Sequence, residues 1–283
     1  MITIGLTTWS DHPALINDEQ RKVKLNEYTG YFPTVEVDNP FYGIPRLTTI
    51  KQWQHQVPKD FQFVIKANKL MTKHDLKSLM PANDEQRLQA FANFKIAMQP
   101  LLEAGQLKTI LFQFPPYFQR NNDNIRYLIK IRKLLGKKMP ITVEFRNPSW
   151  TEDGVYSSVV QYLKHFNMTL AIVDEPHNLN NGIEFKPVIT NNKLAFLRLH
   201  GRNEDGWFHQ GKDWRSQRTL YRYNDSELKS FADSIKGLEK QVDEVCIIFN
   251  NNSGKDAAPN ALKLKDLLHL RFKNLAPKQL DLF

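Results

Sequence analysis

The chain has 283 residues with 41% hydrophobic content, which is enough to bury one large core. Its single cysteine excludes internal disulfide bonds, and the sequence has no Cys-x-x-Cys pair of the kind that holds structural zinc. No run approaches the roughly 20 apolar residues of a membrane span, and no apolar signal core opens the chain. We therefore expect a cytoplasmic protein with no membrane-embedded part.

The charge balance is basic, with a formal net charge of +9 and a pI of about 9.4. An excess of lysine and arginine favours polyanionic partners such as nucleic acid, or a small phosphorylated ligand. A generally basic surface without such a partner is the alternative, and charge alone does not choose between them.

Eight short apolar segments have the β-branched, alternating pattern of strands. Most are separated by segments with helical spacing of apolar residues, and this alternation predicts a closed parallel (β/α)8 barrel of the TIM type. One such barrel is expected to fill residues 1–275 as a single domain. The predicted strands are residues 2–8, 34–39, 61–67, 108–114, 141–146, 169–174, 194–200 and 245–250.

Helical spacing of apolar residues is clear in six segments. Pro58 ends the first of them and Gly105 stops the second. Asn224 followed by Glu227 is a capping-box arrangement that starts the fifth. In chain order, the expected helices cover residues 47–57, 84–103, 125–135, 155–166, 224–238 and 262–272.

Two late connections break this regular pattern. Residues 175–193 contain five asparagines, two prolines and no helical period, so the sixth helix is expected to be short, missing or replaced by a loop. The stretch after the seventh strand, residues 201–223, also has little period and is rich in aromatic residues, arginine and histidine. Long segments of this composition suit a lid or a binding loop for a flat or phosphorylated ligand.

Polar side chains gather where the predicted strands end, which is where barrels of this type carry their chemistry. The segment 141–150 shows the pattern most clearly, because Glu144 and Arg146 share the face opposite Val143 and Phe145. The full set at the strand ends is Glu36, Asn39, Lys66, Gln113, Glu144, Arg146, Asp174, Arg198, His200 and Asn250.

The basic and amide side chains in this set suit an anionic substrate. Arginine offers bidentate contact to a phosphate, and a lysine that closes an apolar strand needs a partner. We expect substrate binding by Lys66, Arg146, Arg198, Asn39, Gln113 and Asn250.

The remaining side chains suit acid–base catalysis. His200 is the first candidate because its intrinsic pKa lies near neutrality. Glu36, Glu144 and Asp174 are alternatives, or ligands to a single Mg²⁺ or Mn²⁺ ion, which carboxylates with one histidine favour over structural zinc. The alternative is that these charges only pair with one another inside the mouth of the barrel.

Six short stretches spread over nearly the whole chain resemble the YecE-like family, known as domain of unknown function 72. They are TVEVDNPFY at 34–42, residues 63–67 with 72–74, FQFPP at 112–116, VEFRNPSW at 143–150, RLHGR at 198–202 and residues 248–252. The resemblance implies a TIM-type barrel with a shared site at the strand ends. It implies no reaction, because none is established for the family.

The tail, residues 276–283, ends in Gln279, Leu280, Asp281, Leu282 and Phe283. This pentapeptide looks like the motif by which bacterial polymerases and repair proteins dock on the DNA sliding clamp. An extended end can place the two leucines and the phenylalanine in an apolar cleft while Gln279 hydrogen-bonds at its rim. We therefore expect the sliding clamp as a partner, with a tail folded back on the barrel as the alternative.

Three functions fit these features. The first is an enzyme, a hydrolase or an isomerase, that acts on a phosphate-bearing substrate such as damaged or processed DNA. The second is a sugar-phosphate enzyme with no role on DNA. The third is a non-catalytic adaptor that reaches the clamp through its tail, and it should work normally without Arg146 or Arg198.

Overall fold

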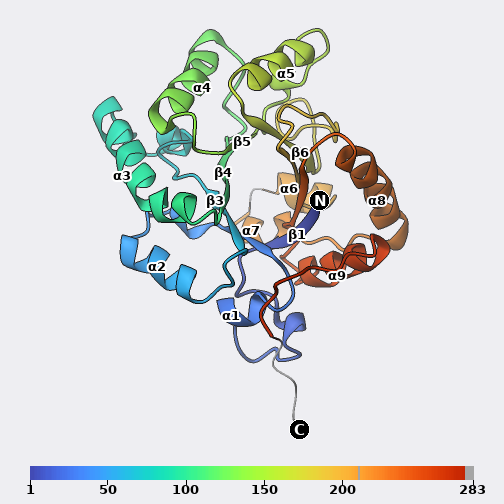
Figure 1. Cartoon of the computed structure of the whole chain (residues 1–283). Coiled ribbons are helices and arrows are strands. Elements are labelled where there is room, and N and C mark those ends of the chain that lie inside the picture. The colour runs from blue at the N-terminus through green and yellow to red at the C-terminus, as the bar shows by residue number, and fades with distance from the viewer. Residues whose placement is uncertain (210, 278–283) are drawn as a thin grey trace.

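A computed structural model describes residues 1–209 and 211–277 of the chain. In these residues eight parallel strands close into a barrel in the order β1 to β8, and helices surround them (Figure 1). The predicted TIM-type (β/α)8 barrel is therefore confirmed. The strands are β1 Ile2–Thr7, β2 Thr34–Val37, β3 Gln62–Lys66, β4 Leu107–Gln113, β5 Ile141–Glu144, β6 Thr169–Asp174, β7 Leu194–Leu199 and β8 Glu244–Phe249.

Most helices follow the strands and cover the outside of the barrel, whereas the short α6 (Glu204–Phe208) and α7 (Trp214–Arg218) lie near its centre in Figure 1. The predicted capping box is present, because the Asn224 side chain accepts a hydrogen bond from the backbone N–H of Glu227. The last helix begins five residues earlier than predicted, after Asp256, and ends at Leu267. The described helices are α1 Leu25–Tyr28, α2 Leu47–His55, α3 Asp84–Glu103, α4 Asn122–Leu135, α5 Tyr156–His165, α6 Glu204–Phe208, α7 Trp214–Arg218, α8 Asp225–Glu239 and α9 Ala257–Leu267.

The connection from β6 to β7 contains no helix in residues 175–193, all of which the structure describes. This confirms the predicted irregularity. The segment instead folds inward, so that Ile183 joins the apolar cluster inside the barrel. Its backbone is fixed by a hydrogen bond from Gly182 N–H to the carbonyl oxygen of Arg146 at 2.7 Å. A loop therefore covers part of the barrel where a helix would otherwise lie outside it.

Alternate residues of each strand face opposite sides of the barrel wall. On β6, for example, Leu170 and Ile172 pack outward with the helices, whereas Ala171 and Val173 pack inside. Cys246 of β8 also lies inside, and burial raises the pKa of its thiol to about 12, so it is an inert structural residue. The side chains that continue the inward-facing rows past the apolar interior form the mouth of the barrel.

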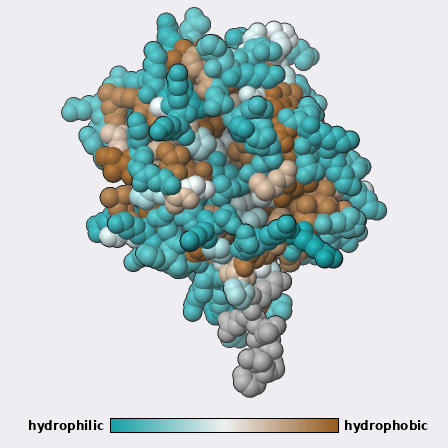
Figure 2. Space-filling view, viewed as in Figure 1, coloured by the Kyte–Doolittle hydropathy of each residue, from teal (hydrophilic) through white to brown (hydrophobic). Residues whose placement is uncertain are grey.

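The outer surface is largely hydrophilic, with hydrophobic patches scattered between polar side chains (Figure 2). Among the residues that the structure describes, no helix combines the length and the apolar character needed to cross a bilayer.

Candidate active site

The centre of the site lies at the end of strand β5 and in the two residues that follow it. The β-branched and aromatic residues Val143 and Phe145 pack outward, and Phe145 stacks on Trp150 with ring centroids 4.1 Å apart. Glu144 and Arg146 therefore face the barrel axis, where both are almost completely buried. Because Glu144 and Arg146 share one face of the strand, as predicted, they lie side by side at the mouth.

Arg198 of β7 links two carboxylates across the barrel. Its guanidinium Nη2 lies 2.6 Å from Glu36 Oε1, and its Nη1 lies 3.0 Å from Glu144 Oε2. Nη1 also donates to the side-chain oxygen of Gln113 at 2.9 Å. The Arg198 side chain is only 1% exposed, so this cation is held entirely by groups of the protein.

Arg146 forms the second bridge of the network. Its Nη2 lies 2.6 Å from Glu144 Oε1, and its Nη1 lies 2.5 Å from Oε2 of Glu175. Its Nη2 also lies 3.0 Å from Nε2 of His200. Glu144 is thus shared by two arginines, whereas Glu36 and Glu175 each pair with one.

Glu175 is a site residue that the sequence reasoning did not select. It follows β6 directly and continues the inward row of Ala171 and Val173. The loop that replaces the sixth helix holds it, because the backbone N–H of Ile183 donates to Glu175 Oε1 at 3.1 Å. The strict alternation along β6 was the signal that would have found it.

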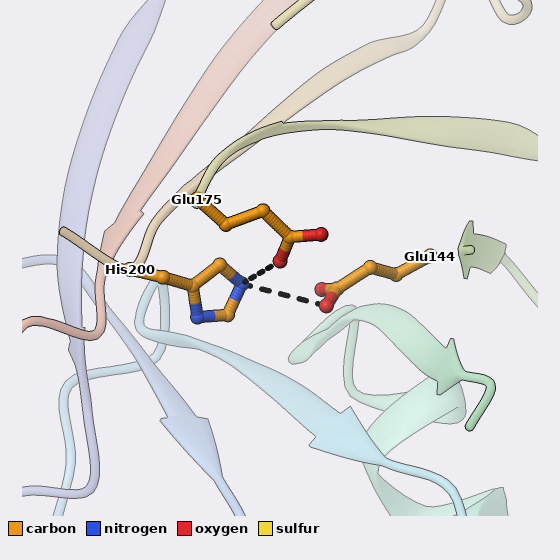
Figure 3. Close-up of side chains that lie close together, drawn as sticks. All are labelled: Glu144, Glu175 and His200. Atoms are coloured by element: carbon orange, nitrogen blue, oxygen red, sulfur yellow. Dashed lines mark ion pairs between the residues drawn. The ribbon is translucent and has the colours of Figure 1, made fainter. Parts of the chain in front are cut away.

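His200 completes the network from the end of β7 (Figure 3). Its Nδ1 lies 2.8 Å from the side-chain amide of Asn250, which fixes the orientation of the ring. Its Nε2 faces Glu144 Oε1 at 3.4 Å and Glu175 Oε2 at 3.8 Å. The imidazole therefore points at the same small volume as the two carboxylates.

Burial and charge divide the carboxyl groups into two kinds. Burial raises the pKa of Glu36 and of Glu175 to about 7, against the opposing effect of their arginine partners. Burial would also raise the pKa of Glu144, but Arg198 and Arg146 together hold it well below its usual range. Glu144 is therefore ionised at neutral pH, while its two neighbours exchange protons there.

His200 is neutral at physiological pH in this environment. Burial lowers its pKa well below the usual range, and the positive charges of Arg146 and Arg198 lower it further. Its intrinsic pKa made it the first acid–base candidate, but the two glutamates have pKa values closer to neutrality.

Three of these groups have the chemistry of a divalent cation site. Nε2 of His200 and one oxygen each of Glu144 and Glu175 lie within 4.8 Å of one another. Arg146 contacts the same three side chains, so its guanidinium already supplies the positive charge at this place. Mg²⁺ or Mn²⁺ would be held by these ligands only after Arg146 moved away.

Three predicted site residues lie apart from this network. Lys66 faces Asp38, with Nζ 3.6 Å from Oδ1. Asn39 is exposed in the loop after β2. Asp174 points outward from the barrel, as its position next to Glu175 requires, and pairs with Arg202 at 2.8 Å.

The upper wall of the mouth comes from segments with little sequence period. Trp207 of α6 packs on His200 with ring centroids 5.5 Å apart, and Arg218 of α7 lies over the Trp207 ring. His74, from the loop after β3, is also partly buried here. Burial lowers its pKa to about 3, with further lowering by the positive charges of Lys66, Arg146 and Arg218. Three cations, Lys66, Arg146 and Arg218, therefore act together on His74 at the mouth.

An eight-stranded parallel barrel with ionisable side chains at its C-terminal mouth is a TIM-type barrel protein. A family model described as "Protein of unknown function DUF72" matches residues 3–281, so the chain belongs to the DUF72 family. This confirms the resemblance seen in the sequence motifs.

Relatives and solved structures agree over the full chain. UPF0759 protein YunF of Bacillus subtilis is 36% identical over 286 residues, and the alignment covers 100% of this chain and 100% of YunF. The crystal structure of a DUF72 family protein from Enterococcus faecalis is 38% identical, with a TM-score of 0.90 over 99% of this chain and 100% of that one. A DUF72 structure from Thermotoga maritima is 28% identical, with a TM-score of 0.78 over 95% of this chain and 100% of that one.

The residues predicted to bind the sliding clamp, Gln279, Leu280, Leu282 and Phe283, lie outside the described residues. The chain approaches them along the N-terminal end of the barrel, where the backbone N–H of Ala276 donates to the carbonyl oxygen of Thr29 at 3.1 Å.

Proposed function

We propose that the protein is an enzyme that binds a phosphate-bearing substrate at the C-terminal mouth of the barrel and transfers protons through its buried glutamates. One observation carries this proposal. Glu36, Glu144 and Glu175 lie in a single buried network with Arg146, Arg198 and His200, at the end of the barrel where enzymes of this fold act.

The two outer glutamates suit general acid–base catalysis. A catalytic acid or base works best when its pKa lies near the working pH, and Glu36 and Glu175 both have pKa values of about 7. Glu144 lies between them as a fixed negative charge that keeps both arginines in place. One outer glutamate can accept a proton while the other donates one, which suits an isomerase as well as a hydrolase.

The charges around the network favour an anionic substrate. Arg146 and Arg198 are held by fully buried carboxylates at 2.5 and 2.6 Å. Lys66 has only the looser, partly exposed pair with Asp38 at 3.6 Å, so we assign the anion to the outer cations Lys66 and Arg218. Burial lowers the pKa of the nearby His74, and the charges of Lys66, Arg146 and Arg218 lower it further. A phosphate group entering the mouth would meet this positive rim before it reached the glutamates.

A panel of phosphorylated compounds tests the proposal. Sugar phosphates, nucleotides and short single- and double-stranded DNAs would be incubated with wild type, Glu175→Gln and the exposed control variant Arg126→Ala. We expect turnover of at least one class, a loss of about 10²- to 10⁴-fold in Glu175→Gln, and no change in the control. Wild-type turnover retained in Glu175→Gln would overturn the catalytic assignment.

We also propose that the tail docks the enzyme on the sliding clamp, as its sequence motif suggests. The position of Ala276 supports this, because the tail begins at the end of the barrel opposite the mouth and would leave the mouth open. Binding of wild type to immobilised clamp would be compared with Leu282→Ala/Phe283→Ala. Equal binding by both proteins would contradict the proposal, and turnover should be unchanged by the double substitution.

A further inference from the structure

Two short helices after β7 build a fixed wall above the network. Asn203 joins them, because its side-chain oxygen accepts from the backbone N–H of Gly206 at 3.1 Å and its amide donates to the carbonyl oxygen of Gln217 at 2.9 Å. A Cβ atom on Gly206 would lie 2.2 Å from that same carbonyl oxygen, so only glycine permits this approach. The close packing of α6 and α7 holds Trp207 and Arg218 in a defined relation.

Trp207 has a buried donor with no partner, and the Arg218 cation beside it forms no ion pair among the described residues. Trp207 is only 4% exposed, and its indole Nε1–H has no hydrogen-bond partner among the described residues. Buried tryptophan N–H groups ordinarily have an acceptor, and an unpaired one is costly. Arg218 stacks on the Trp207 ring, with Cζ 4.1 Å from its centroid, and has no ion pair with any carboxylate in residues 1–209 and 211–277.

The wall stands beside the catalytic groups. The Trp207 ring lies 4.8 Å from Arg146 Cζ and 5.5 Å from the His200 ring. Burial and the charges of Arg146 and Arg198 lower the pKa of Arg218 to about 10, although the nearby carboxylates of Glu175 and Glu144 act in the opposite direction. Arg218 therefore remains charged at neutral pH. An anion bound here would relieve the repulsion between the two arginines and would accept the unpaired indole N–H.

We propose that Trp207 Nε1–H and Arg218 form the oxyanion-binding element of the site and hold the phosphate group of the substrate. This inference rests on the proposed function and names the residues that bind the group. A phosphate dianion has enough acceptor oxygens for both donors, whereas a carboxylate shares the chemistry with fewer oxygens and less charge. Sequence pattern did not reveal this pair, because α6 and α7 are too short to show a helical period.

Binding of inorganic phosphate at low ionic strength tests the element directly. Calorimetric titrations would compare wild type with Arg218→Met, Trp207→Phe and Arg126→Ala, an exposed arginine on α4. We expect the dissociation constant to rise about 10- to 100-fold in Arg218→Met, less in Trp207→Phe, and not at all in Arg126→Ala. Urea midpoints equal to wild type would show that the variants are folded. Unchanged affinity in both mouth variants would overturn the proposal.

Two further readouts separate this inference from the proposed function. Acetate titrations distinguish a phosphate site from a general carboxylate site, and phosphate should bind the more tightly of the two. Turnover provides the second readout. Loss of turnover in Glu175→Gln, with turnover and phosphate affinity intact in Trp207→Phe and Arg218→Met, would sink the oxyanion element and leave the enzyme proposal standing. Weakened phosphate binding in both mouth variants, with no phosphorylated compound turned over, would support the element and remove the enzyme proposal.

Discussion

The two ends of the barrel both bury charge, and they do so differently. At the N-terminal end, Lys108 pairs with Glu244, and Thr3 donates its hydroxyl to the same carboxylate at 2.5 Å. Each charge there has its partner. At the mouth, Glu144 is shared by Arg146 and Arg198, and neighbouring donors remain unpaired.

The difference separates a structural ion pair from a site. A single cation and a single anion that satisfy each other close the bottom of the barrel and leave nothing for a ligand. The network at the mouth has shared carboxylates, two pKa values of about 7 and an unpaired indole N–H, and perturbed groups of this kind are typical of functional sites.

The N-terminal end of the barrel has a groove of its own. A groove of about 750 Å³ lies at the N-terminal end and is lined by Pro33, Lys59, Gln62 and Phe272, among others. None of its lining residues belongs to the charge network at the mouth.

Removal of Arg198 should have the largest effect on stability. Arg198→Met leaves Glu36 and Glu144 without their shared partner, and breaking a buried ion pair in this way costs about 3–5 kcal/mol. Urea denaturation measures the loss. The double variant Glu36→Gln/Arg198→Met should recover part of it, and an Arg198→Met protein as stable as wild type would show that the network is not coupled.

The pair at the other end should affect stability alone. Lys108→Met leaves Glu244 without its ion-pair partner. Glu244 keeps some contact with solvent, so we expect the free energy of unfolding to fall by about 2–3 kcal/mol. Turnover per folded molecule should equal that of wild type. A Lys108→Met protein that is folded but inactive would break the distinction between the two ends.

The pH dependence of stability should report Glu175. Its pKa rises from 4.5 to about 7 on folding, so the folded state binds the extra proton in this window and loses stability as the pH rises through it. Glu175→Gln removes that loss. Urea denaturation at several pH values measures the effect. Between pH 5 and 7, the free energy of unfolding of the variant should rise relative to that of wild type by up to about 1.4 kcal/mol per pH unit. A difference that is constant with pH would contradict the assignment.

The smallest effect concerns metal binding. Arg146→Ala removes the guanidinium from the space between Glu144, Glu175 and His200. Mn²⁺ at ten times its dissociation constant should then stabilise the variant by about 1.4 kcal/mol, measured as a shift in melting temperature. Wild type should shift less at the same concentration. An equal shift in both proteins would show that Arg146 does not compete with the ion.

The sequence predicted the barrel because its strands are apolar on the outward rows and its turns interrupt them regularly. It also predicted Glu144, Arg146, Arg198 and His200 as neighbours, since each is a polar residue at a strand end. Asp174 satisfied the same test, but it lies on the outward row, and the next residue is the one that reaches the axis. The row on which a residue lies, inward or outward, therefore separates Glu175 from Asp174, whereas the residue type does not.

The rest of the site depends on long-range packing. Trp207 and Arg218 lie in a segment whose composition predicted binding, but their contact depends on Asn203 joining two helices of five residues each. The position of Glu175 depends on the loop of residues 175–193, whose Ile183 N–H donates to its carboxylate. Neither arrangement has a local sequence pattern.

The hydrogen bond from Ala276 to Thr29 fixes the start of the C-terminal segment at the N-terminal end of the barrel, which makes this segment a suitable point of attachment. A surface, bead or electrode attached through the C-terminal segment would grip the protein at the pole away from Glu144 and its neighbours. Immobilised in that orientation, every copy would present the mouth of the barrel to the bulk solution. Reagents screened in flow would then reach that face without steric interference from the support.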